Sequence, residues 1–240
     1  MVRRPLSKIT FLTICLQFNA CASFEPGMRY QDLMRPRQPT VMQVQDGLEV
    51  SIEEFATAQK SQQAFDADVA PYGILPLLLK VNNGGTQSYR LREHEVSVFL
   101  GNASLASLSG ERAASQSANS EYAGKALGWT VLTGPFAILL WPATIAGSAS
   151  HTAAVNRRIE QHFESMKFND ALLRPNQSTA GFVYFKLPSG IKKLENLRVE
   201  VTPSEEQTAK QVSYSLSLPP LDLSSAVSGL TSGTGESSKP

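Results

Sequence analysis

Short runs in which apolar and polar residues alternate recur along most of this chain, and they constrain its fold more than any other feature. Residues 48–53 read LEVSIE, residues 95–100 read EVSVFL and residues 197–202 read LRVEVT. A period of two places every second side chain on the same face of a strand. Comparable apolar segments occupy residues 74–81, 88–91, 103–108, 171–173, 181–187 and 211–218. About eight or nine short strands at a spacing of roughly ten residues predict a mainly β fold, an antiparallel sandwich.

Turn residues separate several of these predicted strands. The sequence NNGG at residues 82–85 follows the densest apolar run. Gly101 and Asn102 stand between two further runs and predict a two-residue hairpin loop, because glycine and asparagine accept the left-handed backbone that such loops need.

The first 20 residues have the pattern of an export signal. Residues 1–8 (MVRRPLSK) are basic, and residues 9–18 (ITFLTICLQF) are apolar. An apolar segment of this length is too short to cross a bilayer, which takes about 20 residues. The chain is therefore predicted to be exported, with residues 1–20 as a signal peptide.

The end of this segment resembles the lipobox of bacterial lipoproteins. Ala20 stands directly before Cys21, although Phe18 occupies the position where that family usually has leucine. The resemblance implies cleavage by signal peptidase II before Cys21 and lipidation of its thiol. Ala22, in place of an aspartate, implies release to the outer membrane. Two alternatives stay open: an ordinary signal peptide cut near Ala20 or Ala22, and an uncleaved anchor.

Cysteine content and charge exclude several classes of protein. Cys15 and Cys21 are the two cysteines of the chain, so the mature domain is predicted to have neither a disulfide nor a thiolate metal site. The whole chain has 22 basic and 21 acidic residues. Without Arg3, Arg4 and Lys8 the balance becomes slightly acidic, which argues against nucleic-acid binding.

The pattern of composition suggests four segments. Residues 1–20 are the signal peptide, and residues 21–45, rich in proline, glutamine and arginine, are expected to form a lipidated tether. Residues 46–222 form the predicted sandwich, with an insertion at residues 109–168. The Ser/Gly-rich residues 223–240 are expected to be a disordered tail.

The order of predicted strands resembles an immunoglobulin-like domain without cysteines. Residues 172–175 (LLRP), followed by residues 181–185 (GFVYF), resemble a strand pair of poorly characterised bacterial envelope lipoproteins. This resemblance implies a fold and says nothing of an activity.

The insertion interrupts the β pattern with an uncharged, apolar stretch. Residues 126–156 contain no Lys, Arg, Asp or Glu, and Pro135 and Pro142 disfavour one continuous helix. We expect an apolar helical hairpin over residues 124–153. Beyond it, one amphipathic helix is predicted because apolar side chains recur at helical spacing. These are Val155, Ile159, Phe163 and Met166.

Three roles for the hairpin remain open. It can pack on its own sandwich, insert into the membrane with tryptophans at the interface, or form a contact in a homo-oligomer or with an envelope protein partner. The residues expected to contact membrane or partner are Trp129, Phe136, Leu139, Leu140 and Trp141.

No reaction centre is recognisable. His94 lies in a charged segment and is expected to be solvated, and His151 and His162 lack a clear third metal ligand. Motifs for nucleophilic catalysis or phosphate binding do not occur. We therefore expect no cofactor, no metal and no enzyme activity. The favoured hypothesis is a non-catalytic outer-membrane lipoprotein, a scaffold or binding module held by acylated Cys21. The alternative is a membrane-inserted oligomer assembled through residues 124–153.

Overall fold

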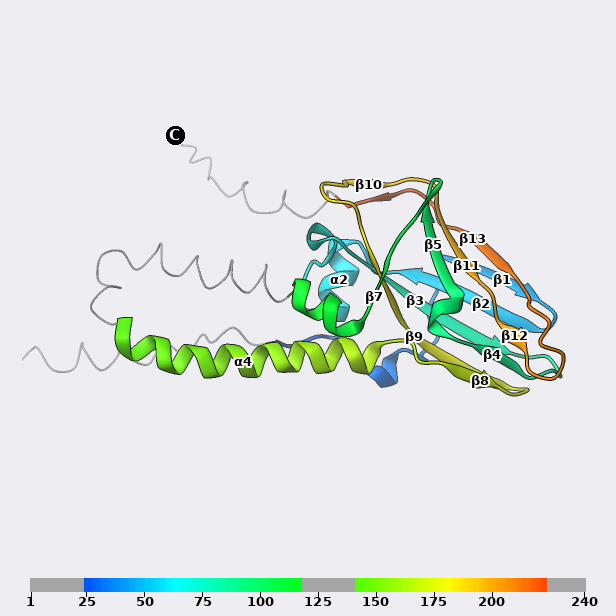
Figure 1. The fold of residues 1–240 in the computed structure, drawn as a ribbon, viewed down its shortest axis with the longest axis horizontal. Coiled ribbons are helices and arrows are strands. Elements are labelled where there is room, and N and C mark those ends of the chain that lie inside the picture. The colour runs from blue at the N-terminus through cyan, green and yellow to red at the C-terminus, as the bar shows by residue number, and fades with distance from the viewer. Residues whose placement is uncertain (1–23, 118–140, 224–240) are drawn as a thin grey trace, which may run out of the picture.

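The computed structural model describes residues 24–117 and 141–223, and the fold they form is mainly β (Figure 1). The strands are β1 Val41–Gln45, β2 Leu48–Glu54, β3 Ile74–Asn83, β4 Tyr89–Leu91, β5 Val96–Leu100, β6 Ala103–Ser104, β7 Ser107–Leu108, β8 Ala171–Leu173, β9 Gln177–Lys186, β10 Lys193–Leu194, β11 Leu197–Val201, β12 Ser204–Glu205, β13 Tyr214–Ser217 and β14 Leu221–Asp222. The helices are α2 Ala58–Phe65 and α4 Trp141–Met166, with 3-10 turns η1 Tyr30–Asp32, η2 Ala70–Tyr72 and η3 Glu93–Glu95. Residues 110–117 are also helical.

Two antiparallel sheets supply most of this architecture. One has five strands in the order β1-β2-β3-β9-β7, and the other has four in the order β13-β11-β5-β6. Alternate side chains of β2, β3 and β9 share one buried apolar cluster with side chains of β5, β11 and β13. The two sheets therefore face each other across this core. Two smaller sheets, β12-β4-β8 and β10-β14, extend the fold.

The strands expected from alternation are present. The runs at residues 48–53, 95–100 and 197–202 correspond to β2, β5 and β11, and the expected antiparallel pairing is confirmed for β11 with β5. Gly101 and Asn102 form the loop of the β5–β6 hairpin, in which Leu100 pairs with Ala103. The run at residues 103–108 splits into β6 and β7, which belong to different sheets.

A second buried cluster lies on the outer face of the five-stranded sheet. Ile74 and Leu78 of β3, together with Phe182 and Tyr184 of β9, point to this side. Side chains of α2, of residues 110–117 and of α4 cover them. Because both faces of β3 and β9 are buried, these strands read as nearly continuous apolar runs (ILPLLL and GFVYF) instead of clean alternation.

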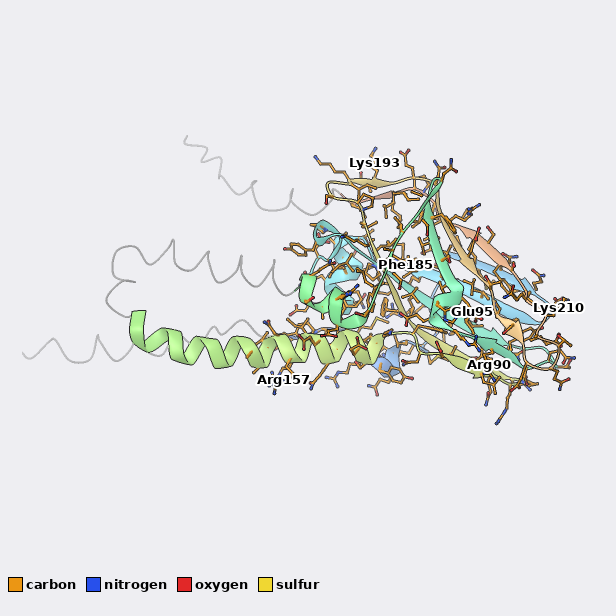
Figure 2. All side chains as sticks on the ribbon, in the orientation of Figure 1. Arg90, Glu95, Arg157, Phe185, Lys193 and Lys210 are labelled. Carbon is orange, nitrogen blue, oxygen red and sulfur yellow. The ribbon has the colours of Figure 1, made fainter. Side chains whose placement is uncertain are left out.

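The predicted amphipathic helix is confirmed in the second half of α4. Val155, Ile159, Phe163 and Met166 are 8% exposed or less, and all belong to the outer cluster. Arg157, Arg158, Glu160 and Glu164 are exposed. Figure 1 shows α4 lying along the body of the fold and continuing beyond it, and Figure 2 shows Arg157 pointing away from the sheets. This part of the insertion therefore packs on its own domain.

Pro142 is the second residue of the described part of α4, which is continuous from Trp141 to Met166. The residues before Trp141 lie outside the described structure, so the break between two helices at Pro135 and Pro142 stays a prediction.

The expected tether over residues 21–45 is wrong for residues 24–45. Met28 and Leu33 are each 1% exposed and belong to the outer cluster. Strand β1 pairs with β2 along its whole length, from Val41 opposite Ile52 to Gln45 opposite Leu48. The apolar residues of this segment do not recur at a regular spacing, because each one is buried separately by elements distant in the sequence. Residues 24–45 are therefore part of the folded domain, which was expected to start at residue 46.

Some expectations fall outside the described residues: the signal peptide (residues 1–20), lipidation of Cys21, residues 124–140 of the apolar hairpin and residues 224–240 of the tail. Over residues 24–117 and 141–223, no helix has the length and apolar character that a membrane crossing requires.

Candidate functional site

The residues singled out in the sequence are mostly not part of the described structure. Trp141 opens the described part of α4. The others lie outside the described ranges: Cys21, Trp129, Phe136, Leu139 and Leu140. We therefore consider two regions that the described residues do define, the place where the chain joins the domain and a hollow beside η2.

The chain joins the domain at a junction of α2 and α4. The ring of Phe24 lies edge-on to the imidazole of His162, with 5.4 Å between centroids. The backbone N–H of Glu25 donates a hydrogen bond of 3.0 Å to Oδ2 of Asp66, the C-cap of α2. Residue 24 is therefore held on the domain. Since three extended residues span about 10 Å, Cys21 cannot lie much farther than that from this junction.

His162 is part of this junction. Its Nε2 lies 2.8 Å from the carbonyl oxygen of Ala64 in α2, and its ring packs edge-on against Phe65. Burial lowers the pKa of His162, and the hydrogen bond with Ala64 partly offsets this effect. Because the Ala64 oxygen accepts, Nε2–H of His162 is the donor to the end of α2, and burial disfavours the charged imidazolium.

An aromatic cluster fixes α4 and α2 on the sheet next to this junction. Phe65 stacks on Phe163 at 4.8 Å and meets Phe182 edge-on at 5.0 Å. The Tyr184 hydroxyl donates a hydrogen bond of 3.2 Å to the carbonyl oxygen of Phe163. Burial raises the pKa of Tyr184 well above its ordinary value. The chain therefore enters the domain at a rigid, well-packed place.

The second region is a hollow between two loops, which we call the η2–β9 hollow. It is lined by residues 68–73, on the way from α2 to β3, and by residues 186–192, after β9. Its volume is about 590 Å³, within the range of small-molecule pockets, roughly 300–1,000 Å³. Backbone hydrogen bonds fix its walls: the Leu187 N–H donates to Gly73 at 2.8 Å, and the Leu223 N–H donates to Lys192 at 2.8 Å.

Charged side chains of both signs line this hollow. Lys186 and Lys192 are exposed, and Asp68 is half-buried. Burial raises the pKa of Asp68, and a hydrogen bond from the backbone of Ala70 lowers it in part. Oδ1 of Asp68 is buried and has no hydrogen-bond partner among the described residues. This oxygen is shielded from solvent, so it does not open into the hollow although Asp68 lines it.

The described residues hold no other recognisable chemical centre. Within residues 24–117 and 141–223, no three His, Cys, Asp or Glu side chains are grouped as a metal site requires. His94 is exposed in η3, as expected. Oε1 of Glu164, two residues from His162, accepts a hydrogen bond of 2.7 Å from the backbone N–H of Glu111.

Comparisons with known proteins give no family. No protein-family model matches the chain, and no curated protein matches it. Two solved structures from Bacillus subtilis are similar at low identity. One, from subsp. subtilis str. 168, is described as "a putative lipoprotein (ycdA)". It has 11% identity and a TM-score of 0.35, and the match covers 78% of this chain and 39% of the other chain. The other is the yjhA protein, with 8% identity and a TM-score of 0.37 over 75% of this chain and 96% of that one.

Sequence reasoning missed both regions for the same reason. The hollow combines loops more than 100 positions apart in the sequence, and the junction joins Phe24 to His162. Neither has a local motif. The one signal available was indirect: Lys186 and Lys192 flank a Pro-Ser-Gly turn directly after a strongly apolar strand.

Proposed function

We propose that this chain is a non-catalytic envelope lipoprotein, anchored in the outer membrane by acylated Cys21. Its domain, an immunoglobulin-like sandwich with an inserted apolar hairpin, serves as a scaffold or binding module on the periplasmic face. The lipobox-like residues before Cys21 support the anchor. The observation that carries the proposal is the junction at Phe24, because a domain that begins three residues after the lipidated cysteine is held close to the membrane surface.

Direct attachment has a physical consequence for the orientation of the domain. Three residues span at most about 10 Å, so the end of α2 and the second half of α4 would be the described parts of the domain nearest an anchor at Cys21. The β12-β4-β8 sheet and the β1–β2 hairpin lie at the other end of the molecule (Figure 1). A partner in the periplasm would meet that far end first.

Metabolic labelling tests the anchor. The full chain is expressed in a Gram-negative host with radiolabelled palmitate, and the membranes are then fractionated. We expect label in the parent and in the control Cys15→Ala, with both in the outer membrane, and no label in Cys21→Ala. An unlabelled parent, or label that survives in Cys21→Ala, would refute lipidation at this position.

A second candidate function is a membrane-inserted oligomer formed through residues 124–153. The observation that favours it is the first half of α4, which continues beyond the body of the fold and has no charged residue before Arg157 (Figure 1). Such a helix can bury its apolar side chains against other copies or in lipid.

Alkaline carbonate extraction separates the two functions. The test uses the unlipidated Cys21→Ala variant with and without residues 126–148. Release of both forms into the soluble fraction supports the simple lipid anchor. Retention of the longer form alone supports insertion through the hairpin.

A further inference from the structure

We infer that two copies of this chain pair along the free edge of strand β1, the side of Val41–Gln45 that is not bonded to β2. The pairing is antiparallel and joins the two five-stranded sheets into one. Dimerisation of this kind is independent of the lipid anchor. Three features carry it: free backbone groups on β1, exposed apolar side chains beside them, and a register in which two identical strands complement each other.

The turn between β1 and β2 determines which backbone groups of β1 are free. The two turn residues, at positions 46–47, have φ angles of 52° and 79°, as the central residues of a type I′ hairpin turn have. Gln45 and Leu48, which close this turn, are therefore a hydrogen-bonded pair. Because bonded and non-bonded pairs alternate along an antiparallel ladder, Met42 and Val44 direct their N–H and C=O groups away from β2.

The edge that these groups form is long and unprotected. Strand β1 ends its sheet and pairs with β2 alone. Over residues 24–117 and 141–223, the backbones of Met42 and Val44 form no hydrogen bond beyond that pairing. Oε1 of Gln43 accepts a hydrogen bond of 3.2 Å from the Ser215 N–H of β13, so β1 covers the edge of β13. Proteins usually protect their own long edge strands with charges or proline, and β1 (VMQVQ) has neither.

The side chains of β1 fit a second copy of the same strand. Met42 is 54% exposed and Val44 is 60% exposed, and both point to the same face because they stand two residues apart. When two copies pair about a two-fold axis at Gln43, Met42 of each copy lies directly opposite Val44 of the other. Opposite Cβ atoms are then about 4.5–5.5 Å apart, so these side chains cover each other. The free N–H and C=O groups of one copy meet those of the other in the same register, as a self-complementary two-fold contact requires.

The helical layer leaves room for this pairing. Figure 1 shows the β1–β2 hairpin at the end of the molecule away from α4, so the long helix does not obstruct the edge. The two-fold axis of such a pair is perpendicular to the joined sheet, which places both helical layers on the same side. Phe24 packs against this layer in each copy. Both chains therefore enter their domains from the same side, and two copies held in one membrane can pair.

Sedimentation equilibrium of the full chain, purified from membranes in detergent, measures the association. We expect the parent to dimerise as its concentration rises. Val44→Lys should associate at least about tenfold more weakly, because it places a charge against Met42 of the other copy. The control is Leu172→Lys, which adds the same charge at an exposed apolar residue of β8 and should dimerise like the parent. Both replaced side chains are exposed, and circular dichroism checks that the fold is kept.

Three results would overturn the pairing. A parent that stays monomeric up to about 1 mM would leave the edge of β1 to a strand of another protein. An equal loss in Leu172→Lys would show that the added charge acts without regard to its position. A dimer that survives in Val44→Lys and disappears when residues 126–148 are deleted would place the contact in the hairpin.

Cysteine cross-linking tests the register. The two copies of Gln43 would face each other as a non-bonded pair with Cα atoms about 4.5 Å apart, a separation that a disulfide can span. Gln43→Cys should therefore give a covalent dimer under mild oxidation. The control is Glu49→Cys on β2, because its two copies would be at least three strand spacings apart, about 14 Å. The parent, oxidised in parallel, accounts for Cys15 and Cys21. Equal cross-linking of the two variants, or none in Gln43→Cys, would overturn this register.

Discussion

Gly181 on β9 lies against the chain that leaves α4, and replacing it with alanine tests how the helical layer is fixed to the sheet. A Cβ at this position would stand 2.4 Å from Cα of Phe168 and 2.5 Å from its backbone nitrogen. Carbon atoms in contact prefer about 3.5–4.0 Å, so one of the two backbones must move. Phe168 is fully buried, and its N–H donates a hydrogen bond of 2.8 Å to Phe182. The backbone at Phe168 therefore cannot move away from the new Cβ without disturbing buried contacts and this hydrogen bond.

The expected destabilisation follows from these contacts. Overpacking costs about 1–3 kcal/mol and the loss of one backbone hydrogen bond about 1 kcal/mol, for a sum of roughly 2–4 kcal/mol. For a domain of this size that sum lowers Tm by about 4–16 °C. Urea unfolding followed by circular dichroism measures the free energy, and a thermal scan measures Tm.

Gly84→Ala is the matched control. A Cβ at Gly84 would meet only the carbonyl oxygen of Gly47, at an ordinary 3.6 Å. We expect its free energy of unfolding to be unchanged or raised by up to about 1 kcal/mol, because alanine has less freedom in the unfolded chain. If Gly181→Ala unfolds within about 0.5 kcal/mol of the parent, the close approach of β9 and Phe168 is not a constraint on the fold.

Three further predictions concern single side chains. Phe163→Ala should lower the free energy of unfolding by about 3–5 kcal/mol. Gln161 is exposed on the same helix, so Gln161→Ala should change this free energy by no more than about 0.5 kcal/mol. Equal effects of the two substitutions in urea unfolding would contradict the burial of this face of α4. The pKa of His162 is lower in the folded state than its ordinary value of 6.5. The contribution of this histidine to stability is therefore complete above pH 6.5. It is lost as the pH falls from 6.5 towards the lower pKa of the folded state. Unfolding curves at about pH 7.5 and pH 5 should therefore differ less in His162→Gln than in the parent, and an unchanged difference would argue against this role. Burial raises the pKa of Tyr214 to about 12, so its contribution to stability is present below pH 10 and is lost as the pH rises through 12. An alkaline absorbance titration should lose a phenolate component near pH 12 in Tyr214→Phe, and an unchanged curve in that range would contradict the burial of its hydroxyl.

The strands could be predicted from the sequence because burial on one face leaves a local trace. Val199 and Val201 alternate with Arg198 and Glu200 along β11, and the exposure of these residues alternates in the same way. The stripe from Val155 to Met166 in α4 is a trace of the same kind at helical spacing. In both cases a regular element packs a regular face against the core.

Burial by distant segments leaves no such trace. Met28 and Leu33 stand in a proline-rich stretch without a period, yet both are buried under the helical layer. Helix α2 has the polar sequence AQKSQQAF, and only Ser61, Ala64 and Phe65 are buried. Strand β1 is a different case, because its signal was local and was overlooked: Asp46 and Gly47, with φ angles of 52° and 79°, are an Asp-Gly hairpin turn between two strands.

The contact between Glu111 and Glu164 has a consequence for how this domain can vary. The Glu111 N–H bonds to the Glu164 side chain at 2.7 Å, so the two ends of the long insertion meet on the same layer of the fold. The residues between these two ends form an excursion, a segment that leaves the layer and returns to it. The entropic cost of closing such a segment grows only with the logarithm of its length, by about 0.6 kcal/mol for each doubling. Because Val155, Ile159 and Phe163 of this excursion are buried against the sheet, only the part outside the packed residues can be exchanged for a shorter, longer or unrelated sequence while the domain stays intact. That makes residues 118–140 a natural position for grafting a foreign segment onto this scaffold.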